Sequence, residues 1–297
     1  MNRVGIVGLG LIGGSLGLAL RTCGWQVIGY DCDPLTMEQA HQIGACDCLA
    51  NSVVEAASTS QVLVVAVPSS SVAEVVVEAA FAMKPGSVLT DVASVKGPIV
   101  KQLEGRLPAG VCYVGGHPMA GSEKQGIAAA RADLFRNAVW TITPCCSAQN
   151  DQFYLSAVEQ VTQVIRAAGA NPLVVDPEEH DLAVAFTSHL PYLTSLAIAL
   201  TAQSGARRLE LVKKLVAGGF RDATRLARSS PSTACDYSWL NRERLKLAVQ
   251  EFERQLARLK HALDQPGIEE LAAVANSAIE YLDSVEWGIF DVKSKGA

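Results

Sequence analysis

The chain has 297 residues, of which 49% are hydrophobic, so about two domains with sizeable buried cores are expected. Its net charge of −5 makes a nucleic-acid-binding protein an unfavourable interpretation. No apolar run is long enough to suggest a membrane-spanning helix, and the first strand-like run is too short for a signal peptide. We therefore expect a cytoplasmic protein without a nucleic-acid or membrane partner.

Eight cysteines are present, and their spacing matches neither a zinc site nor a redox pair. The sequence contains no CxxC pair, and free thiols are expected to persist in a reducing compartment. We therefore predict no metal site. The eight positions are Cys23, Cys32, Cys46, Cys48, Cys112, Cys145, Cys146 and Cys235.

The N-terminal stretch follows the order strand, glycine loop, helix, strand and acid. A short apolar strand at 3–7 leads into Gly-Leu-Gly-Leu-Ile-Gly, and a helical pattern then continues to about Cys23. Glycines permit a tight turn and the close approach of a pyrophosphate, which the helix N-terminus attracts. In this context dinucleotide binding is a better interpretation than a glycine-rich turn without a ligand. The residues expected at the cofactor are Gly8, Gly10, Leu11, Ile12 and Gly13.

Asp31 follows the second expected strand, at 25–30. A carboxylate at this point accepts hydrogen bonds from the adenosine ribose hydroxyls and repels the 2′-phosphate of NADP. NAD is therefore favoured over NADP as the cofactor. The alternative role for Asp31 is a cap of the next helix, but Asp33 suits that role better because Pro34 follows it.

Strands and helices continue to alternate as far as residue 175. Further strands are expected at 45–49, 62–67, 88–91, 111–114, 139–143 and 173–175, and helices at 34–43 and 151–168 and ending near residues 83 and 104. Repeated βα units predict an α/β fold, a Rossmann-type doubly wound parallel sheet, and we assign residues 1–175 to an NAD-binding domain. Pro68 and Ser69 follow one of these strands and are expected to contact the cofactor, with simple capping of the next helix as the alternative.

The pattern changes at Asp176, where an Asp-Pro-Glu-Glu sequence marks a helix start and strand-like runs stop. Helices are expected at 177–204, 208–217, 241–263 and 268–285. Apolar residues at spacings of three and four form stripes on the last two of these helices. We therefore assign residues 176–297 to an all-helical C-terminal domain that binds substrate and forms a homodimer.

His117 follows the expected strand at 111–114 and is flanked by glycines and a proline, as in a turn. An enzyme that oxidises an alcohol with a nicotinamide needs a group that takes the hydroxyl proton, a second group that orients the first, and a cationic clamp for the substrate. His117 suits the first role, and an incidental histidine is an equally good interpretation of this residue alone. Ser94 and Lys96 come from a neighbouring loop at the same sheet edge, and arginines lie in a polar break at 218–225.

Five motifs, in this order and at this rough spacing, resemble the prephenate/arogenate dehydrogenase family of tyrosine biosynthesis. The resemblance covers nearly the whole chain, and five ordered motifs are far more specific than the glycine loop alone. The motifs lie at Gly8–Gly13, Asp91–Lys96, Gly116–Gly121, Ser188–Pro191 and Gly219–Arg225.

The resemblance implies an NAD(P)-dependent oxidative decarboxylation, in which hydride leaves the hydroxyl-bearing ring carbon and the ring carboxylate departs as CO2. It implies that His117 binds the ring hydroxyl and that Ser94 orients this histidine and contacts the cofactor. Arg225 resembles the residue that binds a substrate carboxylate. Glu123 and Asp222 resemble an acidic pair that positions this arginine, with a plain surface ion pair as the alternative.

The resemblance also implies that His189 and Tyr192 contact the substrate, since both lie at the helix motif that faces it. The alternative for His189 is a buried histidine bonded to backbone. The residues leave the choice between prephenate and arogenate open.

Two other classes of protein fit parts of the sequence. A β-hydroxyacid-type dehydrogenase joins the same two kinds of domain, but it needs a catalytic lysine on the first helix of the helical domain, and residues 177–204 contain none. A non-catalytic NAD-sensing protein would bind the cofactor, but it would leave His117 and Arg225 without roles.

Overall fold

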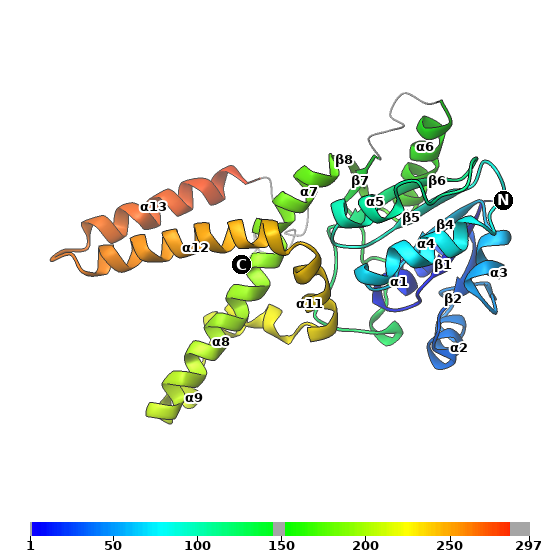
Figure 1. Cartoon of the computed structure of the whole chain (residues 1–297). Helices are drawn as coiled ribbons and strands as arrows, with labels where there is room; N and C mark the ends of the chain where they lie inside the picture. Colours follow the sequence, from blue (N-terminus) through cyan, green and yellow to red (C-terminus); the bar gives the residue numbers. More distant parts are fainter. Residues whose placement is uncertain (1, 145–151, 286–297) are drawn as a thin grey trace.

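The structure is a computed structural model that describes residues 2–144 and 152–285. Cys145, Cys146 and residues 286–297 of the assigned second domain lie outside the described residues. The α/β half lies on one side of the molecule, and the long helices of the other half extend away from it (Figure 1).

The α/β half alternates strands with helices, as its sequence predicts. Its strands are β1 (Arg3–Val7), β2 (Gln26–Tyr30), β3 (Cys48–Leu49), β4 (Val62–Val65), β5 (Val88–Asp91), β6 (Cys112–Pro118), β7 (Val139–Thr143) and β8 (Asn171–Val174). Its helices are α1 (Leu11–Thr22), α2 (Pro34–Gln42), α3 (Val53–Ser58), α4 (Val72–Ala80), α5 (Gly97–Leu103) and α6 (Gln152–Ala167), with 3-10 turns η1 (Ser69–Ser71) and η2 (Ile127–Ala129).

The described strands form one eight-stranded sheet in the order β3-β2-β1-β4-β5-β6-β7-β8. The chain winds outwards from β1 in one direction and from β4 in the other, and these two strands pair in parallel with Val7 opposite Val65. The glycine loop after β1 and the Pro68 loop after β4 therefore lie together at the carboxyl edge of the sheet. In doubly wound sheets this point of reversal is where ligands bind.

The direction of β7 is the exception to the predicted parallel sheet among the described strands. Strand β7 pairs with β6 antiparallel, with His117 opposite Thr141, and β8 then pairs with β7 in parallel. The segment 119–138 contains only the short turn η2 and no crossover helix that would return the chain to the starting edge. The next strand therefore begins where β6 ended and runs back, as antiparallel strands do.

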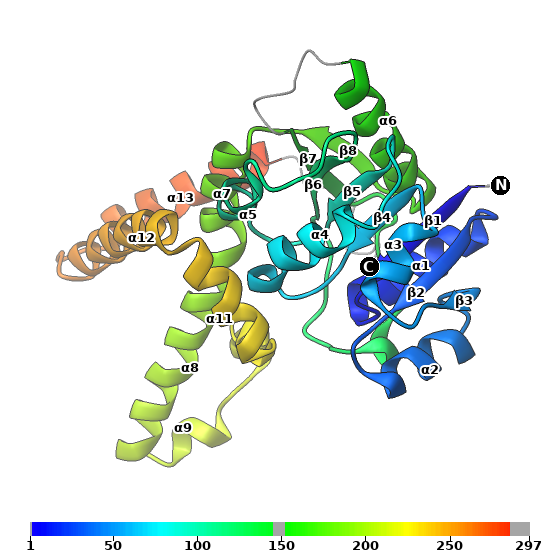
Figure 2. The same ribbon diagram turned by 45° about the vertical axis from the view of Figure 1, so that its right-hand side comes forward.

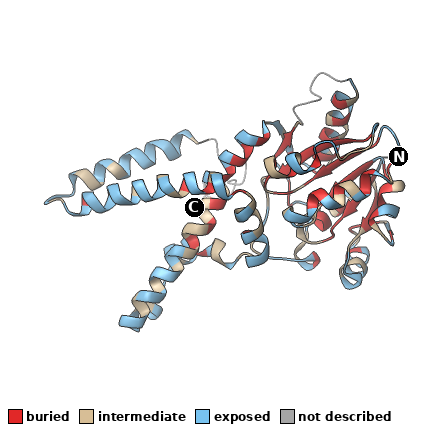
Figure 3. Ribbon diagram, in the orientation of Figure 1, coloured by how far each residue is buried: buried red, intermediate tan, exposed pale blue. Residues whose placement is uncertain are grey.

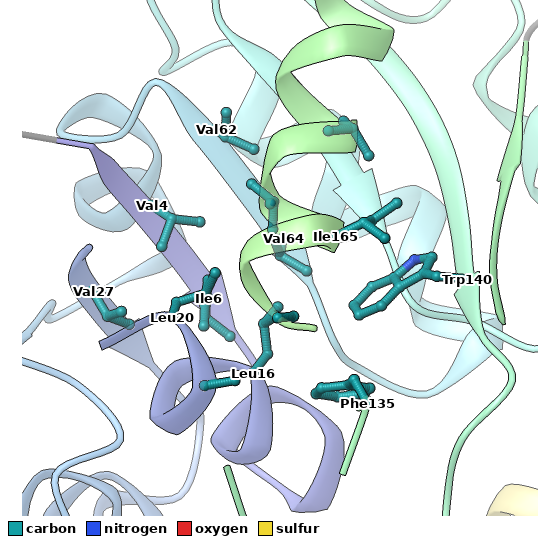
Figure 4. Close-up of a cluster of buried hydrophobic side chains, with 14 of the residues drawn as sticks. Val4, Ile6, Leu16, Leu20, Val27, Val62, Val64, Phe135, Trp140 and Ile165 are labelled. Atoms are coloured by element: carbon teal, nitrogen blue, oxygen red, sulfur yellow. The ribbon is translucent and has the colours of Figure 1, made fainter. Parts of the chain in front are cut away.

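Two apolar clusters cover the two faces of this sheet. One joins the sheet to α1 and α6 and contains Ile6, Leu16, Trp140 and Ile165 (Figure 4). The other joins the opposite face to α3, α4 and α5. The adjacent residues Ile6 and Val7 belong to different clusters, as expected for a strand that is buried on both faces.

The helical half begins with a long helix that is interrupted by one π-helical turn. Its elements are α7 (Pro177–Val184), the π turn η3 (Ala185–His189), α8 (Leu190–Arg208), α9 (Leu211–Lys214), α10 (Gly218–Ala223), the 3-10 turn η4 (Arg225–Arg228), α11 (Pro231–Leu240), α12 (Arg242–Leu263) and α13 (Glu269–Ser284). Figure 2 shows α12 and α13 as a hairpin that projects from the molecule. The sequence patterns did not predict α3, α11 or the π turn, and the expected polar break at 218–225 contains the short helix α10.

Most residues of the projecting helices α12 and α13 are exposed in a single chain (Figure 3), and several of them are large and apolar. On α12, the apolar stripe is buried at Leu245 and Ala248, but Leu256 is 54% and Leu263 is 70% exposed. A helix with an apolar face needs another surface to cover it. Part of the apolar stripe of α12 is therefore not covered by other residues of a single chain.

Taken as one helix, Pro177–Arg208 is long and apolar enough to cross a membrane by length and composition alone. The expectation that no stretch reaches this length is therefore wrong. The first part of the helix contacts α5 and carries two fully or nearly buried polar residues, His180 and Asp181. This arrangement is that of a helix that joins the two halves of a folded protein.

Candidate active site

The glycine loop between β1 and α1 leaves room and hydrogen-bond donors for a phosphate group. Gly8 has a φ of 94°, and a Cβ at Gly8 or at Gly13 would collide with a backbone carbonyl oxygen. By contrast, a Cβ at Gly10 would have no described atom within 4 Å. Helix α1 begins at Leu11 without a side-chain cap among the described residues. Open space in front of free helical N–H groups fits the pyrophosphate of a dinucleotide.

Asp31 is held beside this loop at the end of β2. Its Oδ2 accepts a hydrogen bond from the Leu9 N–H at 2.7 Å, and its Oδ1 accepts one from the Asp33 N–H at 2.9 Å. The carboxylate of Asp33, not that of Asp31, caps α2 by accepting from the N–H groups of Leu35 and Thr36. The contact of the Asp31 carboxylate with a ribose stays a prediction.

The loop after β4 contacts the helical half of the molecule. Pro68 and Ser69 lie in this loop, and the N–H of Ser70 donates to Oδ2 of Asp236 on α11 at 3.1 Å. A contact of Pro68 and Ser69 with the cofactor stays a prediction.

A cavity of about 660 Å³ opens beside the first residue of α1. Leu11 forms part of its wall, and the rest comes from the segment that follows β6, including Glu123, Lys124 and Arg131. Glu123 is thus placed at a cavity that begins at the expected phosphate site.

His117 belongs to a strand rather than to a turn, which corrects the interpretation of its sequence. Strand β6 continues to Pro118, and only 7% of the His117 surface is exposed. Burial lowers the pKa of His117 well below its ordinary value, and the charges of His180 and Lys96 lower it further. The imidazole is therefore neutral at neutral pH, which is the state that can accept a proton.

The buried pair of Asp91 and Lys96 supports the strand that carries His117. The Nζ of Lys96 lies 2.5 Å from Oδ2 of Asp91 and donates to the carbonyl oxygen of Gly116 at 2.6 Å. The other carboxylate oxygen accepts from the Tyr113 hydroxyl and from the Gly116 N–H. Burial lowers the pKa of Lys96, and the charge of Asp91 opposes this shift. Because both side chains are fully buried, Lys96 acts as an internal support rather than as a group that faces a substrate.

The structure gives His117 a different partner from the expected Ser94. Among the described residues no hydrogen bond joins Ser94 to His117, and the Nδ1 of His117 instead lies 2.9 Å from Nε2 of His180 on α7. The two rings meet edge to face at 5.1 Å between their centroids. A residue of the helical half thus contacts His117, and the orienting and cofactor-binding roles of Ser94 stay predictions.

Asp181 joins α7 to the α/β half. Its Oδ1 accepts from the N–H of Lys96 at 2.7 Å, and its Oδ2 accepts from the N–H of Gly97 at 2.9 Å. The same Oδ1 lies 2.9 Å from Nδ1 of His180. The sequence reasoning missed His180 and Asp181, although a His-Asp pair directly after the helix start at Asp176 was a visible signal.

His189 lies in the π turn and is fully buried. Its ring stacks on Tyr237, with 4.5 Å between the centroids, and its Nδ1 lies 3.2 Å from Nδ2 of Asn241. Tyr192, also buried, approaches the same Tyr237 at 6.4 Å. The partner of His189 is thus a side chain rather than backbone, and its Nε2 has no partner in the described part of the chain.

Burial of His189 makes the folded protein less stable in acid. Burial lowers the pKa of His189 to about 4, whereas an unfolded histidine titrates near 6.5. Between these pH values the unfolded chain binds more protons, so the free energy of unfolding falls as the pH falls, by roughly 3 kcal/mol from His189. We expect denaturant titrations at pH 7.5 and 4.5 to show a smaller loss in His189→Gln than in the wild type. Equal losses would contradict this account.

Arg225 and Glu123 come together, whereas Asp222 does not join them. The Nη1 of Arg225, in η4, lies 3.4 Å from Oε2 of Glu123. A hydrogen bond from its own backbone lowers the pKa of Glu123, and Arg225 contributes to this shift. Asp222 is exposed on α10, and no ion pair or hydrogen bond links it to Arg225 within residues 2–144 and 152–285. The clamp role of Arg225 and the positioning roles of the two acids stay predictions.

In the ranges that the structure describes, no group of three His, Cys, Asp or Glu side chains could hold a metal ion. The six cysteines in these ranges form no disulfide with one another.

A dinucleotide loop and a neutral, buried histidine at the same edge of a doubly wound sheet define a nicotinamide-dependent dehydrogenase with a helical second half. The chain belongs to the prephenate dehydrogenase family. The family model described as "Prephenate dehydrogenase, nucleotide-binding domain" matches residues 16–173. The model described as "Prephenate dehydrogenase, dimerization domain" matches residues 176–276.

Individual relatives resemble the chain over most of its length. It is 32% identical to the prephenate dehydrogenase of Bacillus subtilis over 98% of this chain and 77% of the relative. The prephenate dehydrogenase of Aquifex aeolicus has a similar structure, with a TM-score of 0.84 and 28% identity over 96% of this chain and all of that one. A further structure of that enzyme is in complex with hydroxyphenyl propionate and NAD+. Synechocystis arogenate dehydrogenase gives a TM-score of 0.76 and 27% identity over 94% of this chain and 99% of that one.

The β-hydroxyacid class shares only the architecture. The 3-hydroxyisobutyrate dehydrogenase of Salmonella typhimurium is 19% identical, with a TM-score of 0.55, which shows a common fold and nothing further.

Proposed function

We propose that the chain catalyses the NAD-dependent oxidative decarboxylation of prephenate to 4-hydroxyphenylpyruvate or of arogenate to tyrosine. The observation that carries this proposal is the neutral, buried His117 at the end of β6, at the same sheet edge as the glycine loop. The membership of both halves in one family supports it.

The residues of the site divide the chemistry between them. A bound nicotinamide supplies the hydride acceptor. His117 takes the hydroxyl proton as the C–H electron pair leaves the ring carbon. The bond to the ring carboxylate breaks to release CO2, its electron pair makes the ring aromatic, and the proton returns to the ring oxygen. Arg225 holds the side-chain carboxylate, so the ring is placed against His117.

NAD is preferred over NADP because Asp31 places a negative charge where the 2′-phosphate would lie. We expect the double variant Asp31→Ser, Cys32→Arg to raise the NADP-to-NAD ratio of kcat/KM by at least about tenfold, since it replaces repulsion with attraction. Initial rates with each cofactor measure this ratio. The single variant Cys32→Arg is the control, because it keeps the carboxylate. An unchanged ratio in the double variant would show that Asp31 does not select the cofactor.

The reaction itself is tested by initial rates of NADH and NADPH formation with prephenate and with arogenate, each with and without tyrosine. NADH formation with at least one substrate is the expected result. Tight NAD binding without turnover of either substrate would favour a non-catalytic NAD-binding protein instead. The rates with tyrosine show whether tyrosine inhibits the enzyme.

We further propose the domain boundary between residues 175 and 176, a homodimer through the helical half and a cytoplasmic location. The boundary is supported by the end of β8 at Val174 and the start of α7 at Pro177. The match of the helical half to a dimerization domain and the exposed apolar stripe of α12 support the dimer.

A further inference from the structure

Two buried histidines of the site, His117 and His189, meet different chemical groups at Nδ1. His117 faces the Nε2 of His180 at 2.9 Å, and His189 faces the amide nitrogen of Asn241 at 3.2 Å. In a neutral imidazole one ring nitrogen donates and the other accepts. The partner at Nδ1 therefore decides whether Nε2 offers a lone pair or an N–H to the substrate.

The state of His117 follows from Asp181. A carboxylate only accepts hydrogen bonds, and Oδ1 of Asp181 lies 2.9 Å from Nδ1 of His180. In its neutral form His180 therefore carries its single proton on Nδ1 and offers a lone pair at Nε2. His117 must donate its Nδ1–H to that lone pair, which leaves its own Nε2 bare and able to accept a proton.

The state of His189 follows from Asn241. The Nδ2 of Asn241 donates to the backbone carbonyl oxygen of Asp181 at 2.7 Å, and this contact fixes the amide orientation because a carbonyl oxygen cannot donate. The second N–H of the same amide nitrogen faces Nδ1 of His189, which must accept it. His189 therefore carries its proton on Nε2, the atom that is buried without a partner among the described residues.

We propose that Asp181 sorts the two histidines into opposite tautomers: through His180 it makes His117 a hydrogen-bond acceptor, and through Asn241 it makes His189 a donor. His180, Asp181 and Asn241 are positioning residues. The proposal rests on the proposed function, in which one imidazole takes the hydroxyl proton. The Nε2–H of His189 is then a buried donor that suits an acceptor oxygen.

The tautomers can be measured without substrate, cofactor or turnover, so the result is independent of whether the proposed reaction is correct. Magic-angle-spinning 15N–13C spectra of the full chain with labelled histidine distinguish protonated from bare ring nitrogens. The variants His117→Asn and His189→Asn assign the signals by removing them. We expect His117 protonated on Nδ1 and His189 on Nε2 at neutral pH. The same tautomer in both residues, or the reverse assignment, would overturn the proposal.

Kinetics of His180 variants test the series of hydrogen bonds from Asp181 through His180 to His117. His180→Gln keeps an oxygen that can accept from the Nδ1–H of His117, whereas His180→Phe keeps an aromatic ring without an acceptor. With prephenate and NAD, we expect kcat to fall by about 10²- to 10³-fold in the Phe variant, with KM changed less than about threefold, and to recover mostly in the Gln variant. Equal kcat in all three proteins would overturn the proposal, as would equal losses in Gln and Phe variants that fold as well as the wild type. The spectra of the wild-type chain decide the question where the Phe variant does not fold.

Discussion

Replacement of His117 by Asn lowers kcat by roughly 10²- to 10⁴-fold, the usual contribution of a general base. The asparagine fills similar space in β6 but offers no imidazole nitrogen to take up the hydroxyl proton. The binding of NAD should change little, because the cofactor loop belongs to β1 and α1 rather than to β6. The measurements are steady-state rates with prephenate and arogenate and a titration of NAD by calorimetry.

The matched control for this variant is His41→Asn, which changes an exposed histidine on α2 of the same half. It should keep wild-type rates. A His117→Asn enzyme with unchanged kcat would remove His117 from the mechanism. A loss of rate together with a loss of NAD binding would instead indicate damage to the fold. Strand β6, which carries His117, contacts the buried Asp91–Lys96 pair, so a disturbed strand could disturb the sheet.

Replacement of Arg225 by Ala raises KM by about 10- to 150-fold while kcat changes little. The range follows from losing charge-assisted hydrogen bonds worth about 1.5–3 kcal/mol in both the ground state and the transition state. The ion pair with Glu123 is lost as well, but it is exposed and contributes little to stability. Initial rates over a range of substrate concentrations separate the two kinetic constants.

Arg221→Ala provides the control, because it removes an exposed guanidinium from the same motif, on α10. Its KM should stay near that of the wild type. A large rise in KM in the Arg221 variant and none in the Arg225 variant would transfer the clamp to Arg221. A collapse of kcat at constant KM in Arg225→Ala would mean that this residue acts in the chemical step.

The α/β half could be predicted well because its signals are local. The glycine loop, the acid at position 31 and each apolar run of a strand lie within a few consecutive residues. The structure has a strand at or near each predicted apolar run. Asp33 as the cap of α2 was predictable for the same reason. The two N–H groups that donate to its carboxylate are at most three residues away in sequence.

Contacts between distant segments could not be predicted in the same way. His117 and His180 are 63 residues apart in sequence, and nothing in the pattern around either residue indicates that their ring nitrogens meet at 2.9 Å. The antiparallel direction of β7 depends on the absence of a crossover helix, and the segment before it has too little periodicity to show this. Asp222 lies three residues before Arg225, yet no hydrogen bond or ion pair joins the two side chains among the described residues, and its positioning role stays a prediction.

The contact of Asp181 with the start of α5 limits how the two halves can move relative to each other. Its carboxylate caps a helix of the other half, and each of its two bonds to the Lys96 and Gly97 N–H groups is worth about 1.5–3 kcal/mol. A hinge opening between α5 and α7 would break both bonds and expose a buried carboxylate. The start of α5 and the part of α7 that carries Asp181 are therefore held together as long as these two bonds persist.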